Sequence, residues 1–418
     1  MASWWKRSTR EVVAGVVTGV PVRRTRPRAR SRPGSGGDRL EIDLQSDRAR
    51  ALFRCHCRLA PFLVALFGGA AHGQTPVAEP ASRGDAHQTQ ELRIARGAGV
   101  ELGCTLVLPA GRRGTRVPGA VLLTVAGPND RDQSFADKAP FRRLAERLSA
   151  KGVASLRCDD RGIGASGGDW LQASYEVLAA DATAMLERLA GEEGVDARRV
   201  GFIGNSEGGA IGPIAASEPS SGAAFVVLLA GPALSGEAAL RAFLEAAIEV
   251  RNLDVDRAEN LRQRFAELLA IVGRDPGDEA TRADMRRFLQ SGGAFLIPVY
   301  SFVPRELEGL TGFLLSPWYR SQVRYDPSVV IPEVGAPVLH LVGSRDTVLA
   351  AEQHHPAMRR LLEGREDGSD ARVLQGLNHL FQVAETGSPT EYATLDEAYP
   401  DPVVAEIVEW IGAVTATD

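Results

Sequence analysis

The chain has 418 residues, of which 44% are hydrophobic and 24% charged, so it can bury a sizeable core and has an ordinary globular composition. Its net charge of −5 is unevenly spread: residues 1–50 carry twelve Lys and Arg against five Asp and Glu, and residues 75–418 carry 34 against 48. An acidic body is poorly suited to neutralising phosphates, so we expect no nucleic-acid partner.

The N-terminal segment resembles a leader. Residues 1–50 have no helical or strand period, which predicts either a disordered basic leader or a translation start that lies further along. Residues 51–73 combine arginines, a short apolar run and a small-residue end, the pattern of a secretory signal peptide that is too short to span a membrane. We therefore expect a periplasmic or extracellular protein with no stable membrane span after cleavage. The alternative is that residues 59–71 form a core helix.

Four cysteines bear on the redox compartment. Cys55 and Cys57 lie in the predicted signal peptide, whereas Cys104 and Cys158 lie in apolar, strand-like runs of the body. The body has no Cys/His spacing typical of zinc sites, so no metal is expected. A disulfide between Cys104 and Cys158 is compatible with an oxidising compartment, but their apolar surroundings favour buried free thiols.

The body alternates buried strands and amphipathic helices. After a polar linker over residues 74–90, this pattern covers residues 91–233, breaks off, and resumes over residues 335–418. Such alternation predicts a mostly parallel sheet with helices on both faces, which is the α/β class. Residues 234–334 show three helical patterns and an aromatic-rich stretch, and we interpret them as a helical cap inserted into the core. The expected strands are Leu92–Arg96, Leu102–Leu108, Ala120–Val125, Val153–Cys158, Val200–Ile203, Phe225–Leu229, Pro337–Val342 and Ala371–Leu374.

One stretch predicts a strand, a sharp turn and a helix with a serine at the apex. Val200–Ile203 leads into Gly204-Asn205-Ser206-Glu207-Gly208 and then a helix-compatible segment. This arrangement presents a serine hydroxyl beside the N–H groups of a helix start, where an oxyanion can be stabilised. A second G-x-S-x-G match at Ser166 follows a loop and leads into more glycine, so the context favours Ser206.

A serine nucleophile needs a base and an acid, which should follow it at the ends of later strands. Among the later histidines, His340 lies inside a strand and His354 and His355 lie on a predicted helix, with their side chains expected on its surface. His379 directly follows the Ala371–Leu374 strand, so we predict it to be the base.

The acid should follow the preceding strand. Asp346 does so, and Asp370 is the weaker alternative. One oxyanion donor is expected to be the backbone N–H of Glu207. The second should come from the loop after Ala120–Val125, where Pro128 has no N–H, so Ala126 is the first choice and Gly127 the next.

The loop Asp159-Asp160-Arg161-Gly162-Ile163-Gly164 is the remaining polar motif. It lacks the lysine and the spacing of a phosphate-binding loop. We therefore expect a structural, salt-bridged turn at the border of the site.

With these residues, the chain resembles the α/β-hydrolase superfamily and looks most like bacterial EstD-type carboxylesterases, relatives of serine aminopeptidase-like hydrolases. The matching segments are AGPNDRD at 126–132, DDRGIGASGG at 159–168, GNSEGG at 204–209, SPWYR…YDP at 316–327, PVLHLVGSRD at 337–346 and LNHLFQ…TG…EY at 377–392. The sequence departs from the family at Thr124 and Val125, where relatives usually have Gly preceded by His or Ser, which affects the choice of oxyanion donor.

The resemblance implies Ser206 as nucleophile, Asp346 as acid and His379 as base of a carboxylesterase that acts on small ester substrates and uses no cofactor. Two alternatives stay open: a peptidase or amidase of the serine aminopeptidase type, and a non-catalytic binding protein with a hydrolase fold. The oligomeric state is left open by the sequence.

Overall fold

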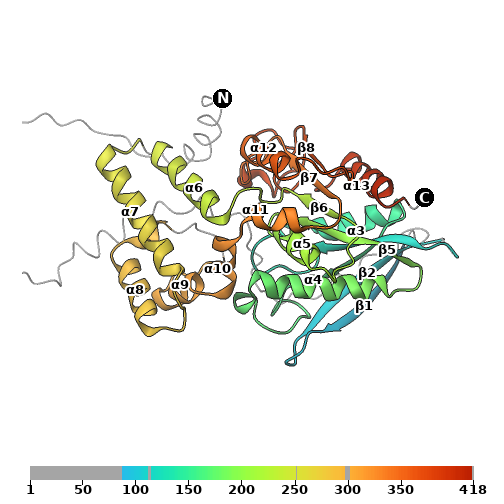
Figure 1. Ribbon diagram of the computed structural model, residues 1–418, viewed down its shortest axis with the longest axis horizontal. Coiled ribbons are helices and arrows are strands. Elements are labelled where there is room, and N and C mark those ends of the chain that lie inside the picture. Colours follow the sequence, from blue (N-terminus) through green and yellow to red (C-terminus); the bar gives the residue numbers. More distant parts are fainter. Residues whose placement is uncertain (1–86, 112–113, 251, 297–301, 417–418) are drawn as a thin grey trace, which may run out of the picture.

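The computed structural model describes residues 87–111, 114–250, 252–296 and 302–416. The predicted leader and signal peptide lie outside these residues. Eight strands form one sheet in the order β1-β2-β4-β3-β5-β6-β7-β8 (Figure 1). They are β1 (His87–Ala95), β2 (Glu101–Pro109), β3 (Val117–Leu123), β4 (Ala154–Cys158), β5 (Val195–Asn205), β6 (Val226–Leu229), β7 (Val338–Gly343) and β8 (Asp370–Leu374).

The sheet is parallel from β4 to β8, and β1 and β2 pair antiparallel at one edge. β1 and β2 form a hairpin, with Gly97 and Gly99 at positive φ in its turn. β1 begins at His87, inside the segment that was expected to be a linker. The sequence pattern does not indicate this start, because the first residues of β1 are exposed on an edge strand and carry no apolar pattern. This sheet order and connectivity are those of the α/β-hydrolase fold.

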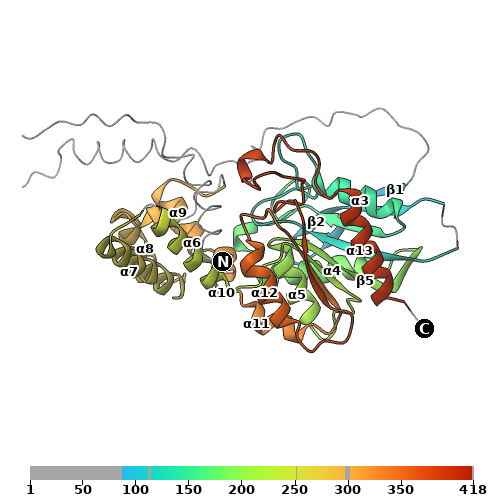
Figure 2. The same cartoon turned by 90° about the horizontal axis from the view of Figure 1, so that it is seen from above.

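Helices cover both faces of the sheet, as the continuous apolar strands require. In β3, Val121 packs into one core, while Ala120 and Leu122 pack into the other. Helices α3 (Pro140–Ala150) and α13 (Asp401–Val414) bury the second core and lie side by side (Figure 2). The first core lies under α4 (Tyr175–Ala190), α5 (Gly208–Ser217) and α12 (Ala351–Leu361).

The chain between β6 and β7 is helical. It contains α6 (Gly236–Val250), α7 (Val255–Val272), α8 (Glu279–Gln290), α9 (Leu307–Leu314), α10 (Pro317–Arg324) and the short α11 (Pro327–Val330). Asp254 and Asp278 cap α7 and α8 through their side chains, and Ser316 caps α10 just before Pro317, which explains where these helices begin.

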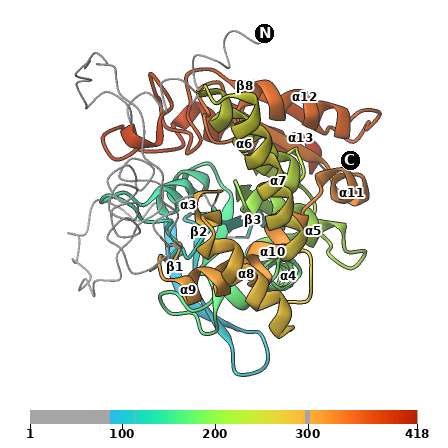
Figure 3. The same cartoon turned by 90° about the vertical axis from the view of Figure 1, so that its left-hand side faces the viewer.

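Helices α6–α9 stand beside the core, with α10 between them and α4 (Figures 1 and 3). The cap meets the core through an aromatic cluster. Trp318 of α10 makes edge contacts with Trp170 and Phe302, with ring centroids 5.1 and 6.1 Å apart. Among the described helices, none is both long and apolar enough to cross a bilayer.

The expectation of free thiols was wrong, because Cys104 and Cys158 form a disulfide. They are directly opposed across the antiparallel pair of β2 and β4, with Cα atoms 4.0 Å apart. β3 separates these strands in the sequence but not in the sheet, so their proximity depends on the strand order. Both residues are buried, as expected.

Candidate active site

The turn between β5 and α5 places Ser206 at its apex. Ser206 has a φ of 53°, an unusual value for a residue with a side chain, and its N–H donates to the Leu229 carbonyl over 2.9 Å. Glycines make this turn possible: a Cβ at Gly204 would lie 2.1 Å from the Gly208 carbonyl oxygen, and one at Gly208 would lie 2.2 Å from that of Leu123. The strand–turn–helix arrangement is therefore the one that the sequence predicts.

Asp346 and His379 meet at the ends of β7 and β8. His379 Nδ1 lies 2.8 Å from Asp346 Oδ2, and both side chains are almost fully buried. The other carboxylate oxygen of Asp346 accepts hydrogen bonds from the N–H groups of Val348 and Leu349, each at 2.8 Å. These bonds fix the carboxylate, which in turn orients the imidazole ring.

Asn205 connects the serine turn to the histidine loop. Its Nδ2 donates to the carbonyl of Leu229 at 2.9 Å and lies 3.5 Å from that of His379, and its Oδ1 accepts from the Tyr399 hydroxyl at 3.2 Å. The residue before Ser206 is thus fully buried and bound to the backbone of His379. His379 is hydrogen-bonded directly to Asp346. Ser206 is connected to His379 through its neighbour Asn205, whose side chain contacts the His379 carbonyl.

The backbone N–H groups of Glu207, Ala126 and Gly127 are the expected oxyanion donors. Among the hydrogen bonds of the described residues, none has one of these three groups as its donor. The Phe302 ring of the cap covers this loop: a Cβ on Gly127, which has a φ of 101°, would lie 2.7 Å from the Phe302 ring. The loop is therefore close-packed and still has free donors.

The Glu207 side chain is buried and turned away from solvent. Burial raises its pKa to about 7, although the Tyr175 hydroxyl and the Trp318 indole donate to the carboxyl. Its Oε1 has no hydrogen-bond partner among the described residues. With a pKa of about 7, this carboxyl is protonated in a substantial fraction of the molecules at neutral pH.

Asp160 lies nearby and is perturbed in the same direction. Burial is the main cause that raises its pKa to about 8, the charge of Glu207 adds to the shift, and hydrogen bonds from Asn129 and Thr124 oppose it. The two carboxyls line a cavity of about 70 Å³, several times the ~10–15 Å³ that one water needs. The cavity is also lined by Thr124, Gly127, Gly208 and Trp318.

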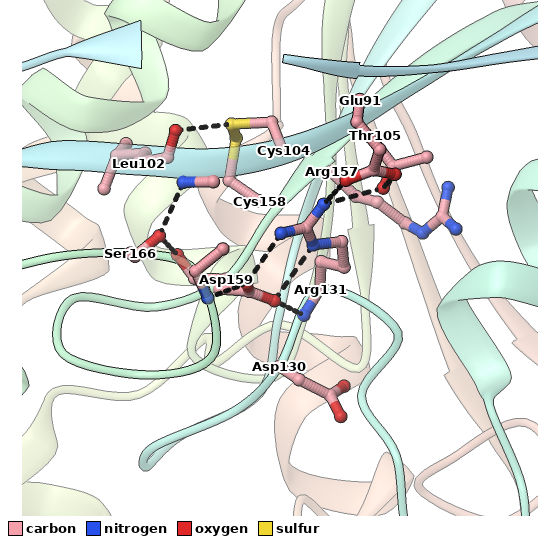
Figure 4. A network of polar contacts seen from close by, with 12 residues as sticks. Glu91, Leu102, Cys104, Thr105, Asp130, Arg131, Arg157, Cys158, Asp159 and Ser166 are labelled. Carbon is pink, nitrogen blue, oxygen red and sulfur yellow. Dashed lines mark hydrogen bonds and ion pairs between the residues drawn. A yellow bond between two sulfur atoms is a disulfide. The ribbon is translucent and has the colours of Figure 1, made fainter. Parts of the chain in front are cut away.

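Asp159 lies at the centre of a polar network beside this cavity (Figure 4). Arg131 binds its carboxylate through the backbone N–H and through the guanidinium, at 2.7–3.0 Å. Burial alone would raise the pKa of Asp159, but Arg131 and the Ala165 N–H hold it below its usual value. Arg161 likewise binds Asp181 at 2.6 and 2.8 Å, so the expected salt-bridged turn is present.

Ser166, the rival serine, has a structural contact set. Its buried hydroxyl donates to the Asp159 carbonyl at 2.8 Å and accepts from the Gly103 N–H at 2.9 Å. Both partners are backbone groups of neighbouring segments (Figure 4). The hydroxyl is therefore bound on both sides, and no base contacts it among the described residues.

Two of the histidines after Ser206, His340 and His354, serve the core. His340 is fully buried in β7, where its Nε2 lies 3.1 Å from the Gly231 carbonyl. His354 was expected on the helix surface, but it is only 3% exposed, and its Nδ1 accepts the Ala233 N–H at 3.0 Å. Burial lowers the pKa of both to about 4. His355 is half-buried on the same helix.

Asp370, the weaker choice of acid, binds the backbone N–H of Ala371 and the side chain of Arg372. Sequence reasoning did not identify the roles of Asn205, Asn129 and Thr124, because each has a hydrogen-bond partner on a segment far away in the sequence. The signal for Asp160 was its place at the end of a buried strand. No group of three or more His, Cys, Asp or Glu suited to a metal occurs in the described part of the chain.

Comparison with known proteins gives a match of residues 138–275 to the family model described as serine aminopeptidase, S33. The matched segment contains Ser206 and ends before Asp346 and His379. Among curated proteins, none matches the chain.

Solved structures resemble the chain at low identity. A hypothetical protein from Pseudomonas aeruginosa is 16% identical, with 81% of this chain and 99% of that chain covered and a TM-score of 0.48. An esterase from Pyrococcus furiosus is 14% identical, with 82% and 100% covered and a TM-score of 0.46. A puromycin-hydrolyzing peptidase from Mycobacterium tuberculosis is 13% identical, with 80% and 41% covered and a TM-score of 0.48.

Proposed function

We propose, on the premise that this chain is a serine hydrolase of the α/β-hydrolase superfamily, that it cleaves carboxylic esters with short to medium acyl chains through an acyl-enzyme. The observation that carries the proposal is the hydrogen bond of 2.8 Å between His379 and Asp346, next to a strained serine turn. A buried acid and imidazole in this order after a serine are what nucleophilic catalysis requires.

In the first half-reaction, the Nδ1–H of His379 donates a hydrogen bond to Asp346. The other ring nitrogen, Nε2, is then free to accept the proton of the Ser206 hydroxyl. Ser206 then attacks the ester carbonyl. The oxyanion is stabilised by the unused N–H groups of Glu207 and Ala126, each expected to lower the barrier by about 3 kcal/mol. His379 returns the proton to the leaving alcohol, and Asp346 stabilises the imidazolium formed in between.

In the second half-reaction, water attacks the acyl-enzyme, with His379 again acting as base. The aromatic cluster of the cap, with Phe302 against Gly127, supports an acyl group of short to medium length.

The ester proposal is tested against the amide alternative with matched substrates. The family match to serine aminopeptidases supports the alternative, so p-nitrophenyl butyrate and the p-nitroanilide of butyrate should be compared in the same preparation. We expect turnover of the ester, lost in Ser206→Ala, and much slower turnover of the anilide. Equal or faster cleavage of anilides, including aminoacyl anilides, would reassign the protein as an amidase or peptidase.

Export is part of the proposal. The signal-peptide pattern of residues 51–73 supports it, and so does the Cys104–Cys158 disulfide, since such bonds persist in oxidising compartments. N-terminal sequencing of the mature protein from a bacterial host should find a start close after residue 73. An intact N-terminal segment in a cytoplasmic fraction would contradict export.

A further inference from the structure

Thr124 connects the two halves of the predicted oxyanion hole. Its carbonyl accepts the N–H of Gly208, at the start of α5, over 2.9 Å. Its hydroxyl donates to Asp160 Oδ1 over 3.1 Å. The serine turn and the loop that follows β3 are therefore both bound to this one residue.

Asp160 holds the far end of the same loop. Its second oxygen, Oδ2, accepts the backbone N–H of Asn129 over 2.8 Å. The Asn129 side chain then donates to the carbonyls of Val125 and Gly127, at 2.8 and 2.9 Å. In a planar trans peptide, the C=O and the N–H point in opposite directions. Because the Val125 carbonyl faces Asn129, the N–H of Ala126 is turned away from Asn129 and stays free.

Asp160 is itself held by its neighbours. The preceding residue, Asp159, is bound by the Arg131 guanidinium and by the N–H of Ala165. The residue before that, Cys158, is joined to β2 by the disulfide (Figure 4). The Arg131 N–H also donates to Asp159 at 2.8 Å, so two consecutive aspartate side chains bind the loop at its beginning and at its end. Such a frame can fix the direction of a backbone donor to the precision that catalysis needs.

We propose that Thr124 and Asp160 are positioning residues that set the direction of the Ala126 N–H, and thereby complete the oxyanion hole from the side opposite Glu207. This inference rests on the proposed serine-hydrolase function. It assigns neither residue a contact with the substrate. It explains how the loop that follows β3 can hold a donor in place: the hydrogen bonds of Asp160 to the Thr124 hydroxyl and to the Asn129 N–H fix its conformation.

The test uses Thr124→Val, which keeps the shape of the side chain and removes the hydroxyl, and Thr124→Ser, which restores it. Asp160→Asn is a second, independent variant, because an amide can accept only one of the two hydrogen bonds. The matched control is Thr415→Val, which removes the hydroxyl of a buried threonine at the end of α13, bonded to the Ile411 carbonyl at 2.7 Å. Melting temperatures of all variants show which of them are folded.

Two readouts report on the oxyanion hole. One is kcat and KM for p-nitrophenyl butyrate, and the other is the rate at which Ser206 is phosphorylated by diethyl p-nitrophenyl phosphate, which requires no natural substrate. We expect Thr124→Val and Asp160→Asn to lower kcat and the phosphorylation rate at least about tenfold with KM changed less than about threefold. For Thr124→Ser, kcat and the phosphorylation rate should remain within about threefold of the wild-type values. Thr415→Val should react like the wild type.

Wild-type phosphorylation rates in folded Thr124→Val and Asp160→Asn proteins would overturn the inference. A rise in KM alone would also overturn it, since that indicates a substrate contact. If the wild type reacts with the phosphate ester but cleaves no carboxylic ester, the proposed esterase activity fails while the phosphorylation rates still decide the inference. If the wild type fails to react with the phosphate ester, both the proposed function and this inference are wrong.

Discussion

The Phe302 ring of the cap lies against Gly127 of the loop after β3, so that a Cβ at this glycine would lie 2.7 Å from the ring. The cap therefore contacts the loop that holds the predicted oxyanion donor. The position of the Phe302 ring therefore affects the loop that carries the predicted oxyanion donor.

Gly127→Ala should reduce the activity by more than a loss of folded protein would account for. The new methyl group would collide with Phe302, and a φ of 101° is strained for any residue with a side chain, so the loop must shift. We expect kcat/KM for p-nitrophenyl butyrate to fall at least about tenfold. Gly99→Ala is the matched control, because Gly99 also has a positive φ of 75° but nothing within 4 Å of the new Cβ. Equal activity of the two variants would contradict the packing argument.

Asp346→Asn should nearly abolish turnover while the protein stays folded. The amide keeps the shape but favours the wrong imidazole tautomer, a change expected to lower kcat by about 10³ to 10⁴. Asp370→Asn serves as the control, since Asp370 binds Arg372 and the N–H of Ala371 instead of a histidine. Steady-state kinetics of both variants distinguish the two acids, and a larger loss in Asp370→Asn would reverse the assignment.

The disulfide should contribute strongly to stability. Cys104 and Cys158 are 54 residues apart, and closing a loop of that length in the unfolded chain corresponds to about 4 kcal/mol in the chain-entropy model. The double variant Cys104→Ala/Cys158→Ala should therefore unfold at a clearly lower urea concentration than the oxidised wild type. An unchanged urea midpoint, or free thiols mapped to Cys104 and Cys158 in the non-reduced wild type, would contradict this expectation.

Asp160 should make the protein less stable as the pH rises. Its pKa is about 8 in the folded protein against an ordinary 3.8, so between these values the folded state holds a proton that the unfolded state has lost. The free energy of unfolding then decreases as the pH rises through this window. Glu207, with a pKa of about 7, acts in the same direction.

Asp160→Asn removes that contribution, so its stability relative to the wild type should improve from about pH 5 to about pH 9 in urea unfolding. Asp159→Asn is the contrasting variant. Because the pKa of Asp159 is lowered, its stabilisation is present above its ordinary pKa and is lost only at lower pH. This variant should thus be destabilised about equally at both pH values. A parallel pH profile for the two variants would argue against a neutral Asp160.

The buried strands and the serine turn could be predicted from the sequence because their signals are local. Continuous apolar runs mark β3 to β7, and glycines at 204 and 208 mark the turn. The first residues of β1 are polar and exposed, so no apolar pattern identifies them as a strand. The boundaries of α4 and α10 follow from side-chain caps that lie outside the periodic pattern.

The contacts that the sequence did not reveal connect segments far apart in the chain. The disulfide depends on β2 pairing with β4, a consequence of the strand order. His354 is buried because it accepts the N–H of Ala233, which belongs to the segment after β6. The bonds of Asp160 to Thr124 and Asn129 likewise join two loops. Residue types at strand ends indicate where such groups gather, but not which atoms they contact.

The central claim, that Ser206 is an activated nucleophile, is tested most directly by labelling with a fluorophosphonate followed by peptide mapping. We expect a single label on Ser206, with ester hydrolysis lost in proportion to labelling. Ser166→Ala should be labelled like the wild type, because the Ser166 hydroxyl is bound to the Asp159 carbonyl and the Gly103 N–H. Unlabelled Ser206 in a protein that still hydrolyses esters, or a label on another residue, would contradict the account, and a protein with neither label nor hydrolysis would be a non-catalytic member of the fold.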